Sequence, residues 1–214
     1  RVILATFFLA FTSNAISQDL SVTHEFKEGQ TASAAEVNQN FNDLVTYVNA
    51  IVSKDTQSNT ATGDNALGNN TKGNNNTASG NKALFYNTEG NFNTASGSFF
   101  LFSNTEGKDN AASGYQALLS NTTGDNNTAS GNQALYSNST GIQNTASGSG
   151  ALFSNTTGDE NTASGYQVLL NNSTGDMNTA IGDAALIANT TGNYNTAIGF
   201  WADVGTGDLE NATA

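Results

Sequence analysis

Few side chains in this sequence are capable of acid–base or metal chemistry, and the acidic ones recur at fixed intervals. Asp125, Asp159, Glu160 and Asp176 all fall beside one column of regularly spaced glycines. Stacked turns would bring such carboxylates close together, and Ca²⁺ prefers carboxylate oxygens as ligands. A calcium ladder needs an oxygen ligand in every turn, however, and the same column also contains a lysine and an isoleucine. We therefore interpret these acids as solvated turn residues and expect neither a metal site nor a cofactor.

The sequence also offers no clear pair of a nucleophile and a general base for catalysis. His24 is the only histidine and there is no cysteine, so no second imidazole or thiolate completes a site with it. The serines that recur in an Ala-Ser-Gly motif occupy a repeated structural position and have no base partner. We interpret His24 as a solvated strand residue, and we expect that the protein is not an enzyme.

These residues are positioned by a 17-residue repeat that starts at Asn59 and continues to the end of the sequence. We number its positions from one to seventeen, with Asn59 at position one. Two glycine columns keep the same interval: Gly63, Gly80, Gly97, Gly114, Gly131, Gly148, Gly165, Gly182 and Gly199 at position five, and Gly73, Gly90, Gly107, Gly124, Gly141, Gly158, Gly175 and Gly192 at position fifteen. Short repeats that cannot bury an apolar face alone stack into a solenoid. The sequence therefore predicts an all-β parallel roll or solenoid with 17-residue coils.

Composition and charge argue against two classes of binding partner. Only 11% of the residues are charged, and 18 acids against 6 bases give a net charge of −12. This balance argues against nucleic acid, because phosphate binding depends on lysine and arginine. It also argues against an anionic membrane surface.

The first residues predict secretion. Residues 2–12 form an apolar run too short to span a membrane but long enough for the apolar core of a signal peptide. Small residues follow at Ser13, Ala15 and Ser17, which suits cleavage near Ala15 or Ser17. We expect a signal peptide at residues 1–17, an upstream start missing before Arg1, and a secreted or cell-surface protein. The alternative is a buried apolar strand or helix.

A short strand and a helix are expected before the repeats. Residues 18–32 contain an alternating apolar and polar stretch that predicts a strand and a turn. Ser33 and Glu36 form a capping box, which predicts a helix over residues 33–53. Its apolar residues fall at heptad spacing, namely Val37, Phe41, Leu44, Val48 and Ile51. This seam suits oligomerisation, with packing on the chain's own strand as the alternative. A polar linker at residues 54–58 leads into the repeats at 59–214.

Each coil is expected to contain two short strands. Position three is alanine in all nine copies, so we expect it to point inward where space is tight. Positions eight to ten combine alanine, leucine and a large apolar residue, which predicts the second strand. The Asn-Thr-Thr-Gly segments, such as residues 121–124, contain residues that tolerate left-handed backbone and cap turns with their side chains, and we expect them to form one edge of the roll. At about 4.8 Å per coil, nine coils make a rod of roughly 40 Å.

Positions nine and ten together predict an interface with another chain. Adjacent residues of a regular strand point to opposite faces. If leucine at position nine fills the coil, the residues at position ten form a second apolar stripe, too long for a soluble monomer to expose. These predicted interface residues are Phe85, Phe102, Leu119, Tyr136, Phe153, Leu170 and Ile187. The alternative is that the two positions lie in a bend and share one core.

The motif Asn-Thr-Ala-Ile-Gly at residues 178–182 and 195–199 resembles the head repeats of trimeric autotransporter adhesins. The repeats are also similar to those that precede chaperone-processed tail-fibre domains. The resemblance covers residues 59–214, although the coil here is longer by its regular Asn-Thr-Thr-Gly insertion. It implies a left-handed parallel β-roll, three chains side by side, and a head that binds host matrix or cells. We expect the chain to continue beyond Ala214, as an anchor or a chaperone domain.

These observations predict a secreted or surface-exposed, non-catalytic adhesive protein that is a homotrimer and binds an extracellular protein or glycan. The ligand is unknown, and recognition is expected on variable positions such as Phe99, Tyr115, Tyr166 and Trp201. An alternative is an ice- or crystal-surface binder, because stacking aligns Thr77, Thr94, Thr128, Thr145 and Thr162 in one column that Ala111 interrupts. A structural spacer of the tail-fibre kind is a third possibility.

Overall fold

The computed structural model describes residues 38–39, 41–42, 57–204 and 210–214. The chain divides into two units, Arg1–Thr56 and Gln57–Ala214, and each is described by itself. In the first unit residues 38, 39, 41 and 42 are helical, within the range predicted for the helix. The predicted signal peptide, the strand that contains His24 and the rest of the helix lie outside the described residues.

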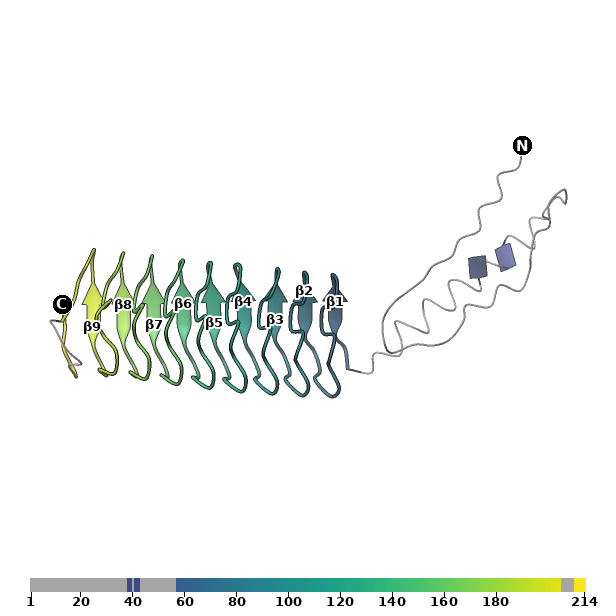
Figure 1. Cartoon of the computed structure of the whole chain (residues 1–214), viewed down its shortest axis with the longest axis horizontal. Coiled ribbons are helices and arrows are strands. Elements are labelled where there is room, and N and C mark those ends of the chain that lie inside the picture. Colours follow the sequence, from purple (N-terminus) through teal and green to yellow (C-terminus); the bar gives the residue numbers. More distant parts are fainter. Residues whose placement is uncertain (1–37, 40, 43–56, 205–209) are drawn as a thin grey trace, which may run out of the picture. The chain divides into compact units, whose positions relative to one another are not determined.

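The second unit is a parallel β-solenoid with one short strand in each coil (Figure 1). The nine strands are β1 (Thr60–Thr62), β2 (Thr77–Ser79), β3 (Thr94–Ser96), β4 (Ala111–Ser113), β5 (Thr128–Ser130), β6 (Thr145–Ser147), β7 (Thr162–Ser164), β8 (Thr179–Ile181) and β9 (Thr196–Ile198). They form one sheet in sequence order, and every pair keeps equal repeat positions opposite each other, as in Ala129 opposite Ala146. The predicted fold class and period are confirmed.

Each strand buries its middle residue and exposes the other two. From β2 to β7 the residues at positions two and four are exposed, whereas the alanine at position three is buried. Ala129 is typical, with 1% of its surface exposed. Position three therefore points inward, as the constant alanine predicts, and the first coil differs because Ala61 is exposed.

The predicted second strand is wrong, because positions six to eleven form a turn segment instead. The leucine at position nine has a left-handed backbone conformation, with φ of +51° at Leu118 and at Leu135. A strand cannot continue through such a residue, so the alternation argument for positions nine and ten does not apply. The two positions lie in a bend, as in the alternative, but they do not share one core, because the residues at position ten from Phe85 to Ile187 are only half-buried. Leucine at position nine packs with the alanines of positions three and eight in a single core, so sheet and turn segment are two layers.

The two glycine columns serve different purposes. At position five the glycines are left-handed, as at Gly131 with φ of +146°. At position fifteen they are not, but a Cβ on Gly124 would lie 2.4 Å from the carbonyl oxygen of Gly141 in the next coil. The Asn-Thr-Thr-Gly segments do not adopt the left-handed backbone that their residues tolerate, but their asparagines cap the turn as expected, as where Nδ2 of Asn121 donates to the carbonyl of Gly124 at 3.0 Å. These segments need glycine because consecutive coils pass too closely for a side chain.

Buried asparagines connect the coils at positions one and twelve. At position one, Oδ1 of Asn110 accepts hydrogen bonds from the backbone N–H of Asn127 at 2.9 Å and from its Nδ2 at 3.2 Å. At position twelve, Nδ2 of Asn138 donates to Oδ1 of Asn121 at 2.9 Å. The two ladders meet at the carbonyl oxygen of Gly141, which accepts hydrogen bonds from Nδ2 of Asn127 at 2.8 Å and from Nδ2 of Asn138 at 3.0 Å. Within the described residues, every buried side-chain nitrogen and oxygen has a partner.

Gln57 supplies the start of this pattern. Its Oε1 accepts from Nδ2 of Asn70 at 2.8 Å, and its Nε2 donates to the carbonyl of Thr71 at 2.7 Å. A glutamine before the first coil thus takes the place that an asparagine of a preceding coil would fill. The ladders then continue through the array, and the strands in Figure 1 show little rotation from one to the next. Flat sheets of many strands are typically held by such side-chain ladders.

Candidate functional site

Three of the four carboxylates considered as calcium ligands, those of Asp125, Asp159 and Asp176, bond to the backbone of the neighbouring coil. Oδ1 of Asp125 accepts from the N–H of Lys108 at 2.7 Å, and Oδ1 of Asp159 accepts from the N–H of Ile142 at 2.8 Å. Asp176 bonds the N–H of Asp159 in the same way, at 2.8 Å. The acids at position sixteen therefore connect coils. In the described part of the chain no group of three histidine, cysteine or acidic residues could hold a metal ion.

The serines of the Ala-Ser-Gly motif lie on the outer face of the sheet. Together with the threonines of position two they make two exposed rows of hydroxyl groups, which we call the hydroxyl face. Ala111 interrupts the threonine row, and Ile181 and Ile198 replace serine in the last two coils. The hydroxyl face carries no charged side chain, because its two rows contain only threonine, serine, alanine and isoleucine.

The residues at position ten are half-buried within a single chain. These are Phe85, Phe102, Leu119, Tyr136, Phe153, Leu170 and Ile187. Their rings cover one another along the rod: Tyr136 and Phe153 are stacked with centroids 5.0 Å apart, and Phe85 and Phe102 with centroids 5.7 Å apart. The chain therefore covers part of this stripe itself. Contact between copies through the stripe remains a prediction, with less apolar surface to cover than a regular strand would leave.

The helical seam has one described member. Phe41 is 64% exposed, as a residue at an interface with another chain would be in one isolated copy. Val37, Leu44, Val48 and Ile51 lie outside the described residues.

Large aromatic side chains are exposed on the turn segments and at the corners before β3 and β9. Tyr115, Tyr166 and Trp201, which the sequence analysis singled out, are 51%, 52% and 58% exposed. Phe99 is half-buried instead, because it contacts Phe102 and lies under the ammonium of Lys82. The sequence analysis did not name Phe200, which is 75% exposed, or Tyr194, which is 52% exposed. Both occupy positions that vary from coil to coil, and this variation was the signal that could have found them.

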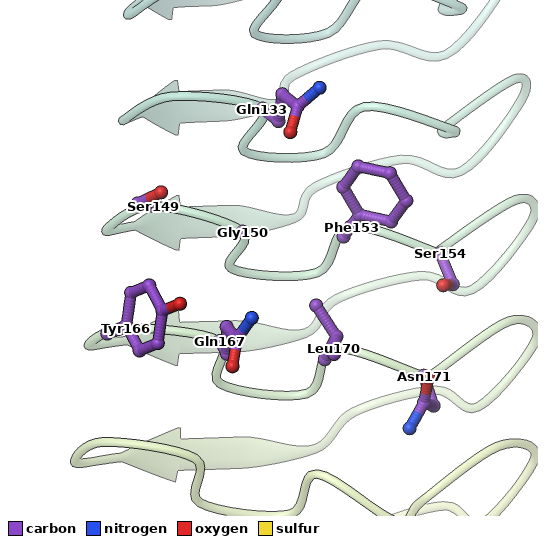
Figure 2. Close-up of a pocket in the computed structure, with 9 residues that line it drawn as sticks. All are labelled: Gln133, Ser149, Gly150, Phe153, Ser154, Tyr166, Gln167, Leu170 and Asn171. Carbon is purple, nitrogen blue, oxygen red and sulfur yellow. The ribbon is translucent and has the colours of Figure 1, made fainter.

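One hollow of about 420 Å³ interrupts the turn segments between the sixth and seventh coils (Figure 2). Gly150 lies at its centre, with Phe153 on one side and Tyr166 on the other. Gln133 and Gln167 belong to the coils before and after Gly150, and their amides border the same space. Aromatic, amide and hydroxyl groups thus meet there, and no carboxylate or ammonium lines it.

No protein-family profile, no curated protein and no solved structure matches this sequence. None of the helical residues described belongs to a helix long and apolar enough to cross a membrane.

Proposed function

We propose that the protein is a secreted or cell-surface, non-catalytic adhesive rod that binds an extracellular glycan or protein. The observation that carries this proposal is the set of large aromatic side chains exposed on a regular array. Tyr115, Tyr166, Tyr194 and Trp201 are each more than half exposed. The core consists of alanine and leucine together with Phe100 and Val168, and it does not contain these rings. Exposed aromatic side chains are typical of binding surfaces, where they supply contact area and hydrogen bonds.

The repeated architecture supports adhesion through many weak contacts. Equal repeat positions in adjacent coils are about one strand spacing apart, about 4.8 Å, because the sheet is parallel and in register. Side chains on different coils are therefore presented at fixed separations along one rod. Several weak contacts to one surface then give an avidity far above that of a single contact.

We further propose that copies associate as a homotrimer through the heptad seam of residues 33–53. The exposed Phe41 and its spacing to the other apolar residues support association, and the number three comes from the resemblance to trimeric adhesins. Sedimentation of the full chain tests this association: a trimer that Phe41→Asp dissociates is expected, and a stable wild-type monomer contradicts it.

Binding of the full chain to mammalian and bacterial cells, to immobilised matrix proteins and to a glycan array tests the adhesive function. In the test variant, serine replaces Tyr115, Tyr166, Tyr194 and Trp201, and the expected result is a loss of binding on the order of tenfold or more. The matched control is Ser113→Thr on the hydroxyl face, which keeps the hydroxyl group. Wild-type protein that binds none of these surfaces, or a variant that binds as well as wild type, refutes the proposal.

The hydroxyl face supports a second candidate, binding to ice or another crystalline surface. Its two hydroxyl rows are uncharged, exposed and in register over nearly flat strands, so they present a regular two-dimensional array. The regular spacing of the hydroxyl groups could match the repeat of a crystal surface. Thermal hysteresis and ice shaping by the full chain, lost on Thr128→Lys with Thr145→Lys, would favour this candidate. Wild-type protein without thermal hysteresis excludes ice.

A further inference from the structure

Gly150 is an exception at position seven of the repeat. The other coils have Asn65, Lys82, Phe99, Gln116, Gln133, Gln167, Ala184 and Trp201 at this position. The exception coincides with the hollow, because position seven is where a side chain would otherwise lie between the two coils.

The backbone does not require glycine at this position. Gly150 has a φ of +69°, which is left-handed, but Gln133 and Gln167 take the same region with φ of +56° and +53°. Phe99 and Trp201 do so as well, at +62° and +54°. The coil therefore accommodates a side chain in this conformation, in contrast to the glycines at position five.

Space does not require glycine either. A Cβ on Gly150 would lie 3.5 Å from Cγ of Gln167 and 3.6 Å from Cδ1 of Leu170, which are ordinary van der Waals distances. At Gly148 in the same coil, the corresponding distance to the carbonyl oxygen of Gly165 is 2.1 Å. Glycine also loses more backbone entropy on folding than any other residue. The fold thus gains from Gly150 only relief from the strain of a left-handed φ, which the glutamines of the neighbouring coils bear, and what the missing side chain provides is the open hollow.

The walls of the hollow combine an apolar surface with free polar groups. Phe153 is held in place by its stacking on Tyr136, 5.0 Å between centroids, and Leu170 continues the apolar wall in the next coil. Nε2 of Gln133 donates to Oε1 of Gln116 at 3.1 Å, which leaves Oε1 of Gln133 as an acceptor. Among the described residues, no partner bonds the side-chain amide of Gln167, which keeps a donor and an acceptor. The phenol of Tyr166 adds a further hydroxyl group.

We infer that this hollow is a binding site for one or two sugar rings of a neutral saccharide. A sugar ring has a face of C–H groups, which would pack on Phe153 and Tyr166, and hydroxyl groups, which would bond the two glutamine amides. The volume of about 420 Å³ lies in the range of small-ligand sites, about 300–1,000 Å³. Lining groups without charge, on a protein of net charge −12, favour a neutral sugar over an anionic one. The inference rests on the proposed adhesive function and names the class of its ligand.

Saturation-transfer NMR and titration of the full chain test the site, with glucose, galactose, N-acetylglucosamine and lactose as neutral probes and sialyllactose as the anionic counterpart of lactose. Gly150→Gln restores the residue of both neighbouring coils and fills the hollow, so the fold tolerates it and thermal unfolding verifies this. We expect at least one neutral probe to bind wild type, and Gly150→Gln to weaken that binding on the order of tenfold or more. Tyr166→Ser should weaken it too.

The matched control is Phe92→Ser. Phe92 is an aromatic residue of similar exposure, 58% against 52% for Tyr166, but it does not line the hollow and is not one of the residues replaced in the adhesion test. Its substitution should leave saccharide binding unchanged. The inference is overturned when wild type binds none of the neutral probes, or when Gly150→Gln binds them as well as wild type.

The outcome is separable from that of the adhesive function. If the wild-type chain adheres to cells or matrix through its exposed aromatic side chains but binds no neutral probe, the saccharide site fails and the adhesive function stands. If a neutral probe binds and is lost on Gly150→Gln while the chain adheres to no surface, the adhesive function fails and the site stands.

Discussion

The strand side and the turn side of each coil are built on the same core but differ in what they expose. The strand side repeats threonine or serine around a buried alanine with few changes. The turn side keeps alanine and leucine inward at positions eight and nine, while the exposed residues around them range from tyrosine and tryptophan to glutamine and aspartate. The hydroxyl groups of the strand side are uniform, whereas the turn side differs in chemistry from coil to coil.

The difference follows from backbone conformation. Strands paired in register place equal residues side by side, and the middle alanine leaves no room for anything larger. On the turn side, residues at positions seven and nine have left-handed backbone, and within this turn Leu135 is buried while Gln133 is partly exposed. Recognition that varies along the rod therefore belongs to the turn side, and a ligand that repeats with the lattice belongs to the strand side.

The largest effect is expected from the core of the turn side. Leu135 is completely buried, so Leu135→Ala should lower the free energy of unfolding by about 2–5 kcal/mol. Tyr136→Ala is the matched control next to it, since Tyr136 is half-buried and should cost less. Urea unfolding followed by circular dichroism measures both. Equal losses would mean that positions nine and ten share the core to the same extent, which contradicts the inward and outward assignment.

The next effect concerns the ladder at position one, where the turn side passes into the strand. Asn127→Ala removes the acceptor for the backbone N–H of Asn144, a bond of 3.0 Å, and leaves this buried group without a partner. It also removes the bonds from Nδ2 to Asn110 and Gly141. We expect a loss of roughly 2–4 kcal/mol, from one orphaned donor at about 1–3 kcal/mol and the lost bonds.

Asp159→Ala is the control for this ladder. It removes a similar bond between coils, to the N–H of Ile142, but that bond is exposed and water replaces it. Hydrogen exchange of the freed N–H groups distinguishes the two variants. Faster exchange confined to the mutated coil and its neighbours is expected from Asn127→Ala, and a loss no larger than that of Asp159→Ala would contradict a structural role for the buried ladder.

Alanine substitutions of two glycines distinguish a position where the fold requires glycine from a position where it does not. Gly124→Ala places a Cβ 2.4 Å from the Gly141 carbonyl and should destabilise the array by about 1–3 kcal/mol. Gly150→Ala should cost less, about 1 kcal/mol, because its left-handed φ strains a residue with a Cβ but the space around that atom is open. Thermal unfolding of the two variants tests the contrast. If Gly150→Ala destabilises the array as much as Gly124→Ala, the fold itself requires Gly150. The argument that Gly150 is present to keep the hollow open then fails.

The period, the parallel stacking and the inward alanine were predictable, because they depend only on the interval of the repeat and on the size of position three. The turn side was not. Leucine at position nine seemed to belong to a strand, since Leu118 is not a residue type that favours left-handed backbone. It adopts this conformation because the hydrogen bond from its N–H to Ala134 and its burial in the core over-determine it. No local pattern in the sequence indicates that the hydrogen bond and the burial outweigh the strain of the left-handed backbone.

The hollow could not be found from the sequence for a related reason. Gly150 is visible as an exception, but its meaning depends on the conformation of the residues that replace it in other coils and on the distances around its missing Cβ. The buried asparagines were equally hidden. Their constant spacing suggested turn residues, whereas their role as ladders depends on the coils passing within hydrogen-bonding distance of one another.

The smallest effect is expected at the exposed corner between the two sides. Lys72 donates to Glu89 at 2.6 Å, and this bond, followed by the charges of Glu89 and Glu106, raises the pKa of the Lys72 ammonium. A raised lysine pKa contributes stability below the pKa of the unfolded chain and loses it as the pH rises through the folded value, so any contribution disappears only in strongly alkaline solution. Both side chains are largely solvated, at 72% and 50% exposed, and water and salt screen the pair. Lys72→Ala should therefore leave the unfolding midpoint unchanged at neutral pH. A clear drop that high salt abolishes would show instead that the corner contributes to stability alongside the buried ladders.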